Sequence, residues 1–292
     1  MSCVKTFAVV GGDKRQEYLV RQLCESAYIT SVYGLPCADF EADTLIRAKT
    51  LDEALQKADC IILPLPFTTD KTHVNAPLAD RPIVLNELYL HLKKAQTLIG
   101  GKLDDEVYKN AALYDFAAVD FFKCEELEIL NAVPTAEGAL QIAMEQLPVT
   151  LHASSCLVTG YGRVAKLLCR ILGALQARVT VAARSRTDIA WAQADGFETV
   201  NIYTLNPGVH RYDVIFNTVP ALIFDRTLLA KCDPETLLID LASRPGGIDF
   251  EAAGELGLKT VWALSLPGKV APKTSGDILV KTILNIIGEE KP

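Results

Sequence analysis

The most informative chemical pattern in the sequence is a glycine-rich turn. Residues 160–165 read G-Y-G-R-V-A, after an apolar run at residues 156–159 and before a segment with apolar positions at helical spacing. In such a turn the first glycine permits the tight bend, the second lets the backbone approach a pyrophosphate, and the alanine lets helix and strand pack closely. The helix start supplies free N–H groups and a partial positive charge. We therefore predict a dinucleotide site formed by Gly160, Tyr161, Gly162, Arg163 and Val164.

The end of the next predicted strand indicates which dinucleotide is bound. It carries Arg184, Ser185 and Arg186, where an NAD enzyme usually has an acidic residue that accepts hydrogen bonds from the ribose 2′-hydroxyl. Two guanidinium groups and a hydroxyl suit a 2′-phosphate, and no carboxylate is present to repel it. These residues favour NADP as the cofactor. The alternative is that they are solvated loop arginines.

Another loop, residues 217–220 (N-T-V-P), follows the next strand that we expect at the ligand-binding edge. We expect this loop to contact the nicotinamide ribose and ring through Asn217, Thr218, Val219 and Pro220. The alternative is a plain turn before a helix capped by Asp225.

Two more strand ends in this half carry glycine, proline and a cation. They are residues 241–247 (L-A-S-R-P-G-G) and 266–269 (L-P-G-K), and ligands of open α/β sheets bind at such strand ends. Arg244, directly before Pro-Gly-Gly, is therefore predicted to bind an anion.

The first half of the chain has a different turn after its first strand. It reads Gly11-Gly12-Asp13-Lys14-Arg15, and a side chain at Asp13 would obstruct a pyrophosphate. We therefore expect this half to hold a substrate or partner, with Asp13 and Arg15 near the ligand. The alternative is that Asp13 caps a helix whose start is exposed.

The two halves of the chain also share a repeated sequence pattern. Residues 7–23 and 156–172 each read as a strand, a glycine turn with basic residues and an amphipathic helix, and D-C-I-I-L-P-L-P at Asp59 matches D-V-I-F-N-T-V-P at Asp213. Apolar strands that alternate with helices indicate parallel sheets covered on both faces. The fold class predicted is α/β, with two doubly wound, Rossmann-like domains and a cleft between them.

The predicted boundaries follow from this repeat. We expect residues 1–130 to form the first domain, residues 131–148 a linker helix and residues 149–272 the NADP-binding domain. A last helix at residues 273–288 can pack on the first domain. Strands are expected at 5–10, 28–33, 60–64, 97–99, 117–121, 155–159, 178–183, 213–217, 236–241 and 259–264. Helices are expected at 14–25, 86–94 with Asn86 as N-cap, 104–112, 134–146 with Thr135 and Glu137 at its start, 163–173, 187–195, 225–231 and 249–256 closed by Gly257.

Composition and charge exclude several other classes. Of the 292 residues half are hydrophobic and 22% are charged, and the net charge of −7 disfavours nucleic acid and anionic membrane surfaces. The eight cysteines are scattered and the four histidines form no array, so we expect no metal site. No apolar stretch approaches a membrane span, no signal peptide is evident, and a cytoplasmic protein is expected. GxSxG and P-loop motifs are absent, and His73 and His210 are interpreted as surface residues of loops.

Several motifs together resemble the A-subunit family of dipicolinate synthase from spore-forming bacteria. They are V-V-G-G-D-K-R-Q (9–16), N-A-V-P-T-A-E-G-A-L (131–140), G-Y-G-R-V-A, A-A-R-S (182–185), N-T-V-P, L-A-S-R-P-G-G and L-P-G-K-V-A-P-K-T-S-G (266–276). The resemblance implies an NADP-dependent oxidoreductase component of the mother-cell cytoplasm. With the smaller, flavoprotein-like B subunit of dipicolinate synthase it would make dipicolinate from dihydrodipicolinate during sporulation. In outline the family is similar to alanine dehydrogenase and adenosylhomocysteinase.

The implied reaction sets what the residues must do. Oxidation of a dihydropyridine dicarboxylate delivers a hydride to nicotinamide and leaves an aromatic ring, so the enzyme must hold a dianion and accept a proton. Arg244 is the first choice for a carboxylate, and the other candidates for substrate binding are Arg15, Thr135, Ser243 and Lys273. No general base is evident, and Glu137 and Asp13 are the candidate carboxylates.

Two alternatives remain open at this point. One is another two-domain NADP-dependent dehydrogenase that acts on an amino or keto acid. The other is a nucleotide-binding scaffold whose flavoprotein partner carries out the redox step, because no clear base is visible. An oligomer is expected in each case.

Overall fold

The chain folds into two compact units. The structure is a computed structural model that describes residues 6–288, apart from the side chains of residues 206–207. Unit 1 consists of Met1–Leu130 and Ala271–Pro292, and unit 2 consists of Asn131–Val270. Each unit contains one six-stranded sheet in which all strand pairs are parallel. The predicted α/β, Rossmann-like fold class is confirmed.

The sheet of unit 1 has the order β3-β2-β1-β4-β5-β6. Its strands are β1 (Thr6–Val10), β2 (Ile29–Tyr33), β3 (Leu45–Arg47), β4 (Cys60–Ile62), β5 (Thr97–Gly100) and β6 (Ala117–Asp120). The central strands are continuous apolar runs because helices cover both of their faces. The register places Phe7 of β1 opposite Thr30 and Cys60.

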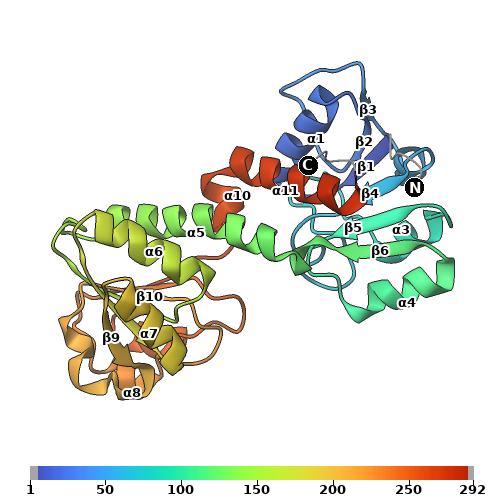
Figure 1. The fold of residues 1–292 in the computed structure, drawn as a ribbon. Coiled ribbons are helices and arrows are strands. Elements are labelled where there is room, and N and C mark those ends of the chain that lie inside the picture. The colour runs from blue at the N-terminus through green and yellow to red at the C-terminus, as the bar shows by residue number, and fades with distance from the viewer. Residues whose placement is uncertain (1–5, 289–292) are drawn as a thin grey trace. The chain divides into compact units, whose positions relative to one another are not determined.

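The helices of unit 1 are α1 (Lys14–Glu25), α2 (Leu51–Leu55), α3 (Leu85–His91), α4 (Asp105–Tyr114), the start of α5 (Glu125–Gln146) and α11 (Pro272–Ile287). Helix α11, red in Figure 1, lies alongside α1 although the two are far apart in the sequence. Gly276 permits this approach, because a Cβ there would lie 2.8 Å from the Arg15 carbonyl oxygen. The predicted N-cap Asn86 is wrong, since α3 begins at Leu85 after Val84.

Unit 2 repeats the same topology. Its order, β12-β11-β10-β7-β8-β9, is the order of unit 1 written in the opposite direction. The strands are β7 (Ser155–Thr159), β8 (Arg178–Ala183), β9 (Glu198–Asn201), β10 (Val214–Asn217), β11 (Leu237–Asp240) and β12 (Lys259–Trp262). The helices are α6 (Arg163–Ala174), α7 (Arg186–Ala194), α8 (Arg226–Leu229), α9 (Phe250–Glu255) and α10 (Leu266–Val270).

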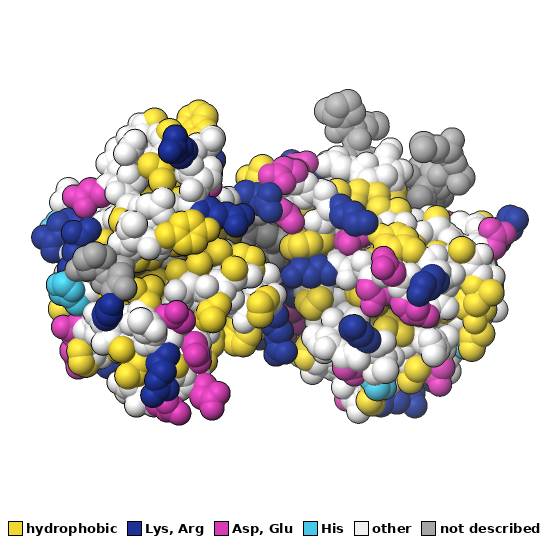
Figure 2. Space-filling model, turned by 90° about the horizontal axis from the view of Figure 1, so that it is seen from below, with side chains coloured by type: hydrophobic (Ala, Val, Ile, Leu, Met, Phe, Trp, Pro, Cys, Tyr) yellow, Lys and Arg dark blue, Asp and Glu magenta, His cyan; other side chains and the backbone are white. Residues whose placement is uncertain are grey.

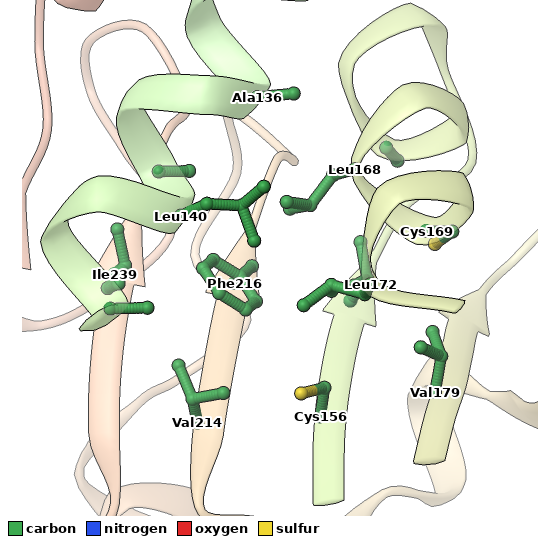
Figure 3. Packing of buried hydrophobic residues seen from close by; sticks show 14 of the residues in the cluster. Ala136, Leu140, Cys156, Leu168, Cys169, Leu172, Val179, Val214, Phe216 and Ile239 are labelled. Carbon is green, nitrogen blue, oxygen red and sulfur yellow. The ribbon is translucent and has the colours of Figure 1, made fainter. Parts of the chain in front are cut away.

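One of the two buried clusters of unit 2 lies between its sheet and the helices α5 and α6. Figure 3 shows Leu140 of α5 and Leu168 and Leu172 of α6 packed above Phe216 and Ile239 of the central strands. All five side chains are buried. This packing fixes the carboxyl ends of β7, β10 and β11, and therefore the loops that follow them.

Helix α5 differs from its prediction. It begins at Glu125 and continues for 22 residues through Pro134, although the prediction started it at Pro134. Proline is common in a first helical turn, which is why Pro134 suggested a helix start. Thr135 therefore lies inside the helix, where its hydroxyl donates a 2.8 Å hydrogen bond to the Asn131 carbonyl. The predicted strand end at residues 266–269 is also wrong, because β12 ends at Trp262 and α10 begins at Leu266.

Three further observations concern the surface charge, the length and polarity of the helices, and the side chains that could bind a metal. On the face shown in Figure 2, acidic and basic side chains of the described residues are interspersed. Within residues 6–288, no helix is long and apolar enough to cross a bilayer. In the same range, no three His, Cys, Asp or Glu side chains are grouped in a way that would hold a metal ion.

Candidate functional site

The glycine turn of unit 2 has the backbone that a tight strand-to-helix bend needs. Gly160 has a φ of +81°, and a Cβ there would lie 2.7 Å from the Thr218 hydroxyl. Both the backbone conformation and the close neighbour select glycine. The Gly160 N–H donates a 2.8 Å hydrogen bond to the Ala182 carbonyl of β8, which ties the turn to the next strand.

The N-terminus of α6 opens from this turn without a side-chain cap. Gly162 is the N-cap residue, and it provides no side-chain cap hydrogen bond to the first turn. A Cβ at Gly162 would meet no described atom within 4 Å, so the space in front of the amides is open. Ala165 is fully buried against the sheet. A helix start without a side-chain cap, the helix dipole and open space beside Gly162 together suit a diphosphate.

Tyr161 differs from the other residues of the turn. Its side chain is 3% exposed, and its hydroxyl donates a 2.5 Å hydrogen bond to Asp195. Burial and the Asp195 carboxylate raise the pKa of Tyr161, so the phenol stays neutral. Only the backbone of Tyr161 is available to a ligand at the turn. Arg163 is exposed and Val164 half-buried in the first turn of α6.

The end of β8 presents two exposed guanidinium groups. The side chains of Arg184 and Arg186 form no hydrogen bond or ion pair with any residue in the described part of the chain. Ser185 between them is the N-cap of α7, and its hydroxyl accepts a 3.4 Å hydrogen bond from the Asp188 amide. Because β8 pairs with β7, these arginines follow the strand next to the glycine turn. Their positive charge is available to an anion.

A buried polar network joins the ends of the three central strands of unit 2. The Thr159 hydroxyl donates to Asn217 Oδ1 at 2.6 Å, and Asn217 Nδ2 donates to Asp240 Oδ1 at 2.7 Å. All three residues are fully buried. Asp240 also accepts from the Ala242 amide at 3.0 Å and from the Gly247 amide at 2.7 Å. The network therefore holds the loops after β10 and β11 in place.

This network changes the role expected for Asn217. Its amide also donates to the Val219 carbonyl at 3.0 Å and accepts from the Val219 amide at 3.2 Å, so its side chain is committed within the protein. Asn217 therefore positions the loop, and ligand contacts by Thr218, Val219 and the exposed Pro220 stay predictions. Asp240 was missed, although a lone aspartate at the end of the apolar run L-L-I-D was a visible signal.

The loops after β10 and β11 lie against each other. The Thr218 hydroxyl donates to the Thr159 carbonyl at 2.6 Å. Gly247 packs so closely that a Cβ would overlap Asn217 Nδ2 and lie 2.7 Å from the Val219 carbonyl oxygen. Residues 217–220 and 241–247 therefore form one rigid edge of unit 2.

Arg244 stands on this edge over an aromatic ring. Its guanidinium carbon lies 5.6 Å from the centre of the Trp262 ring, and the residue is exposed. Trp262 is itself fixed, because its indole N–H donates to the Ala242 carbonyl and its ring stacks on Phe250. Within the described residues Arg244 has no ion pair. The ring orients the guanidinium and leaves its N–H groups for a carboxylate.

The remaining predicted site residues have less specific surroundings. Glu137 is exposed on α5, and Thr135 on the same helix is bonded to Asn131. Ser243 is exposed beside Arg244, and Lys273 is exposed in the first turn of α11 in unit 1. Their roles as base or substrate ligands stay predictions.

The glycine turn of unit 1 is closed by its own side chains. Asp13 caps α1 and forms a capping box with Gln16. The Asp13 carboxylate also accepts from Arg15 Nε and Nη2 at 2.9 and 2.8 Å, and Nη2 donates to the Leu65 carbonyl at 2.7 Å. Arg15 is only 5% exposed. The structure thus matches the capping alternative for Asp13 and buries Arg15 within unit 1.

Comparison with known proteins gives consistent results along the chain. The family model of the N-terminal domain of the dipicolinate synthase A subunit matches residues 6–122. The A subunit of dipicolinate synthase from Bacillus subtilis (strain 168) is 33% identical over 283 residues, which cover 97% of this chain and 95% of the relative.

Solved structures give the same result over nearly the full length. The A chain of dipicolinate synthase from Bacillus subtilis superposes with a TM-score of 0.87 at 32% identity, over 99% of this chain and 97% of that one. The A subunit of dipicolinate synthase from Bacillus halodurans gives a TM-score of 0.89 at 30% identity, over 98% of each chain.

A more distant likeness concerns the fold alone. L-alanine dehydrogenase is 14% identical and superposes with a TM-score of 0.65, over 97% of this chain and 88% of that one. The two-unit architecture is therefore shared with a dehydrogenase.

Proposed function

Because the chain belongs to the A-subunit family of dipicolinate synthase, we propose that it oxidises dihydrodipicolinate to dipicolinate with NADP⁺ as the oxidant. The observation that carries this proposal is the combination of the uncapped glycine turn at residues 160–165 with Arg184 and Arg186 beyond the neighbouring strand. The turn suits a diphosphate and the arginines suit a 2′-phosphate. The chain is then an oxidoreductase of dipicolinate biosynthesis.

The residues of unit 2 fit this cofactor. The Gly160 amide is already bonded to Ala182, so the backbone amides of residues 161–164 would hold the diphosphate, and Arg184 and Arg186 would hold the 2′-phosphate. The Ser185 hydroxyl accepts from Asp188 and still has a proton to donate to the same phosphate. When bound, the oxidised nicotinamide supplies a hydride acceptor. Thr218, Val219 and Pro220, held by Asn217, would line its ribose and ring.

Arg244 is the residue that we assign to the substrate's carboxylate. Dihydrodipicolinate is a dianion, and a guanidinium group can bind a carboxylate through two parallel hydrogen bonds. Stacking on Trp262 reduces the side-chain freedom that Arg244 would otherwise lose on binding. Ser243 lies next to it and can donate a further hydrogen bond. Thr135 and Lys273 remain candidates for the second carboxylate.

The chemistry asks little of the protein beyond orientation and one proton transfer. The product ring is aromatic, so the oxidation is favourable once the ring and the oxidant are held face to face. Correct positioning of two reactants can supply about 7–11 kcal/mol of the barrier. The rigid edge formed by residues 217–220 and 241–247 suits this task.

The family also suggests a partner. The relatives are named as A subunits, so we infer a complex with a second polypeptide, which by resemblance is the flavoprotein-like B subunit. The setting that goes with this assignment is the cytoplasm of the mother cell during sporulation, and an oligomeric assembly is part of the proposal.

The test is a titration of the purified chain with NADP⁺ and NAD⁺, followed by an assay with dihydrodipicolinate. We expect the Kd for NADP⁺ to be at least about tenfold lower, because the 2′-phosphate adds charge-assisted hydrogen bonds. Equal Kd values, or no binding of either nucleotide, would contradict the cofactor assignment. A substrate panel of dicarboxylates and 2-keto acids separates this reaction from other dehydrogenase activities. Turnover only in the presence of the B subunit would favour the scaffold alternative.

A further inference from the structure

A cavity opens at one edge of the sheet of unit 1, and all the residues that line it belong to that unit. Its volume is about 250 Å³, and its lining consists of residues 33–36, residues 48–49 and residues 78–81 with Ile83. The first segment begins at the last residue of β2, the second follows β3, and the third lies between β4 and α3. The cavity therefore lies at the carboxyl edge of a parallel sheet, where ligands of α/β folds bind.

The backbone register relates this cavity to the proposed nucleotide site of unit 2. In unit 1, the Gly11 N–H donates a 2.9 Å hydrogen bond to the Tyr33 carbonyl at the end of β2. In unit 2, the Gly160 N–H donates a 2.8 Å hydrogen bond to the Ala182 carbonyl near the end of β8. The segment after Tyr33 thus corresponds to the arginine-containing segment after β8. In a dinucleotide-binding unit this strand end meets the adenosine ribose, so the cavity occupies the equivalent of the adenosine half of the site.

The part of unit 1 that would correspond to the diphosphate half is closed. Asp13 caps α1. A Cβ at Gly11 would lie 2.9 Å from the side chains of Val74 and Ala76, so the loop after β4 covers the turn. A ligand of unit 1 is therefore confined to the cavity. The cavity is slightly smaller than the range of about 300–1,000 Å³ that is usual for ligand sites, which limits the ligand to about the size of a mononucleotide.

The inner part of the cavity is apolar. Leu35 and Ile83 are buried, and Leu78 and Ala79 are half-buried. Gly34 has a φ of +72°, and a Cβ there would lie 2.5 Å from Ile83 Cδ1, so the loop after β4 packs directly on the end of β2. Such a surface suits one face of a flat ring, because small-molecule sites are lined mainly by apolar side chains with a few polar groups.

The rim of the cavity carries three charged groups. Lys49, Asp80 and Arg81 are exposed, and their side chains form no hydrogen bond or ion pair with any other residue that the structure describes. The two cations suit a phosphate group. The Asp80 carboxylate is an acceptor for ribose hydroxyls, which is the role that an acidic residue has at the end of the second strand of NAD sites. A ribonucleotide thus offers a partner to each of the three charges.

We propose that this cavity is a second ligand site and binds a ribonucleoside monophosphate. The base lies against the apolar inner part, the ribose hydroxyls donate to Asp80, and the phosphate binds Lys49 and Arg81. An aromatic dicarboxylate fits less well, because it has no hydroxyl for Asp80 and its charge is repelled by that carboxylate. The site lies wholly within unit 1 and does not depend on the proposed function.

The first experiment is a calorimetric titration of the whole chain with adenosine 5′-monophosphate (AMP) in the presence of saturating NADP⁺. We expect AMP to bind, and we expect Lys49→Ala and Arg81→Ala each to raise its Kd about fivefold to tenfold, since each removes a charge-assisted hydrogen bond. The control is Lys57→Ala, which removes an exposed lysine before β4, on the opposite edge of the same sheet, and should leave the Kd unchanged. No binding at millimolar AMP, or a Kd that neither cavity variant changes, would overturn the proposal.

The second experiment tests the class of ligand. The wild type should bind 2′,3′-dideoxy-AMP about fivefold to tenfold more weakly than AMP, because Asp80 loses two donors. Asp80→Ala should bind the two nucleotides equally. A preference for AMP that persists in Asp80→Ala, or dipicolinate that displaces AMP and binds more tightly in a manner sensitive to Arg81→Ala, would overturn the assignment to a ribonucleotide.

The third experiment separates this cavity from the nucleotide site of unit 2. Ala79→Phe fills the cavity without changing its charges, and should abolish AMP binding with the Kd for NADP⁺ and the Tm unchanged. AMP binding that NADP⁺ abolishes, or that Arg184→Ala weakens and Arg81→Ala does not, would place AMP in unit 2 and overturn the proposal. If NADP⁺ does not bind at all, the proposed cofactor is wrong, whereas the response of AMP binding to Arg81→Ala still decides whether the cavity of unit 1 is a site.

Discussion

The two units share one sheet order but differ in how they close the turn after their first strand. In unit 2, Gly162 leaves the amides of α6 uncapped and faces open space. In unit 1, Asp13 caps α1 and binds Arg15, so the amides and the nearby cation already have partners. An aspartate cap contributes about 1 kcal/mol to a helix. In the same architecture, the helix start after the first strand can therefore be stabilised by a side-chain cap, as in α1, or left accessible to a ligand, as in α6.

A second difference lies at the ends of the central strands. In unit 2, β7, β10 and β11 end in Thr159, Asn217 and Asp240, which form the buried network. The corresponding strands of unit 1, β1, β4 and β5, end in Val10, Ile62 and Gly100. A polar network in a core is costly unless every member is bonded, and here it fixes two loops. This comparison indicates that precise loop placement is needed in unit 2.

The largest effect is expected from the network of unit 2. Asp240→Ala leaves the Asn217 amide and the backbone amides of Ala242 and Gly247 without their acceptor. We expect the free energy of unfolding to fall by about 3–5 kcal/mol, measured by urea denaturation. Asp225→Ala, which removes only the cap of α8, should cost about 1 kcal/mol. Equal losses of unfolding free energy in the two variants would show that the network contributes no more to stability than a single helix cap.

The next largest effect is expected when the turn of unit 2 is given the capping residue of the turn of unit 1. Gly162→Asp gives unit 2 the capping residue of unit 1, and its carboxylate would occupy the space in front of the α6 amides. We expect the Kd for NADP⁺ to rise at least about 100-fold, because charge repulsion adds to the lost contacts, while Tm is unchanged or higher. Calorimetric titration measures the first quantity and thermal unfolding the second.

Two further variants complete this exchange. Gly162→Ala adds the Cβ without the charge and should raise the Kd less. Asp13→Gly in unit 1 should lower Tm, since α1 loses its cap and Arg15 its ion-pair partner, and should leave the Kd for NADP⁺ unchanged. Tight NADP⁺ binding by Gly162→Asp would mean that the dinucleotide does not use this turn.

A smaller effect concerns the choice between the two nucleotides. Arg184→Ala and Arg186→Ala should each weaken NADP⁺ binding about tenfold, because each removes one charge-assisted contact to a phosphate. NAD⁺ binding should change little, since NAD⁺ has no 2′-phosphate. The measurement is the ratio of the two Kd values for each variant, with Arg178→Ala on the opposite edge of the sheet as control. An unchanged ratio in both variants would remove these arginines from the site.

The smallest effect is expected at Arg244, because the group is exposed. Arg244→Ala should raise the KM for the dicarboxylate about fivefold to tenfold and leave the Kd for NADP⁺ unchanged. Arg244→Lys keeps the charge but cannot bind a carboxylate through two parallel hydrogen bonds, so its KM should lie between those of the wild type and Arg244→Ala. Steady-state kinetics at saturating NADP⁺ measure the KM for the dicarboxylate in each variant. If the Kd for NADP⁺ rises instead, Arg244 belongs to the nucleotide site.

The sequence was sufficient for the parts of the fold that depend on local pattern. The strands at 155–159 and 178–183 coincide with β7 and β8, since continuous apolar runs beside a glycine turn have few other interpretations. The short strands β3 and β9 and the helix α2 were not predicted, because they combine few residues with mixed polarity. The start of α5 was misplaced because Pro134 suggested a first turn.

The candidate site was also predicted only in part from the sequence. The turn at residues 160–165 and the arginines after β8 are recognisable from spacing alone. The burial of Asn217 and the role of Asp240 depend on contacts between strands far apart in the chain, which no local pattern reports.

The most direct test of the central claim is a crystal structure of the chain with NADP⁺ bound. The account predicts density for the diphosphate over the amides of residues 161–164 and the 2′-phosphate within hydrogen-bond distance of Arg184 or Arg186. Density for the diphosphate at the turn of residues 11–15 instead, or a 2′-phosphate directed away from both arginines, would contradict it.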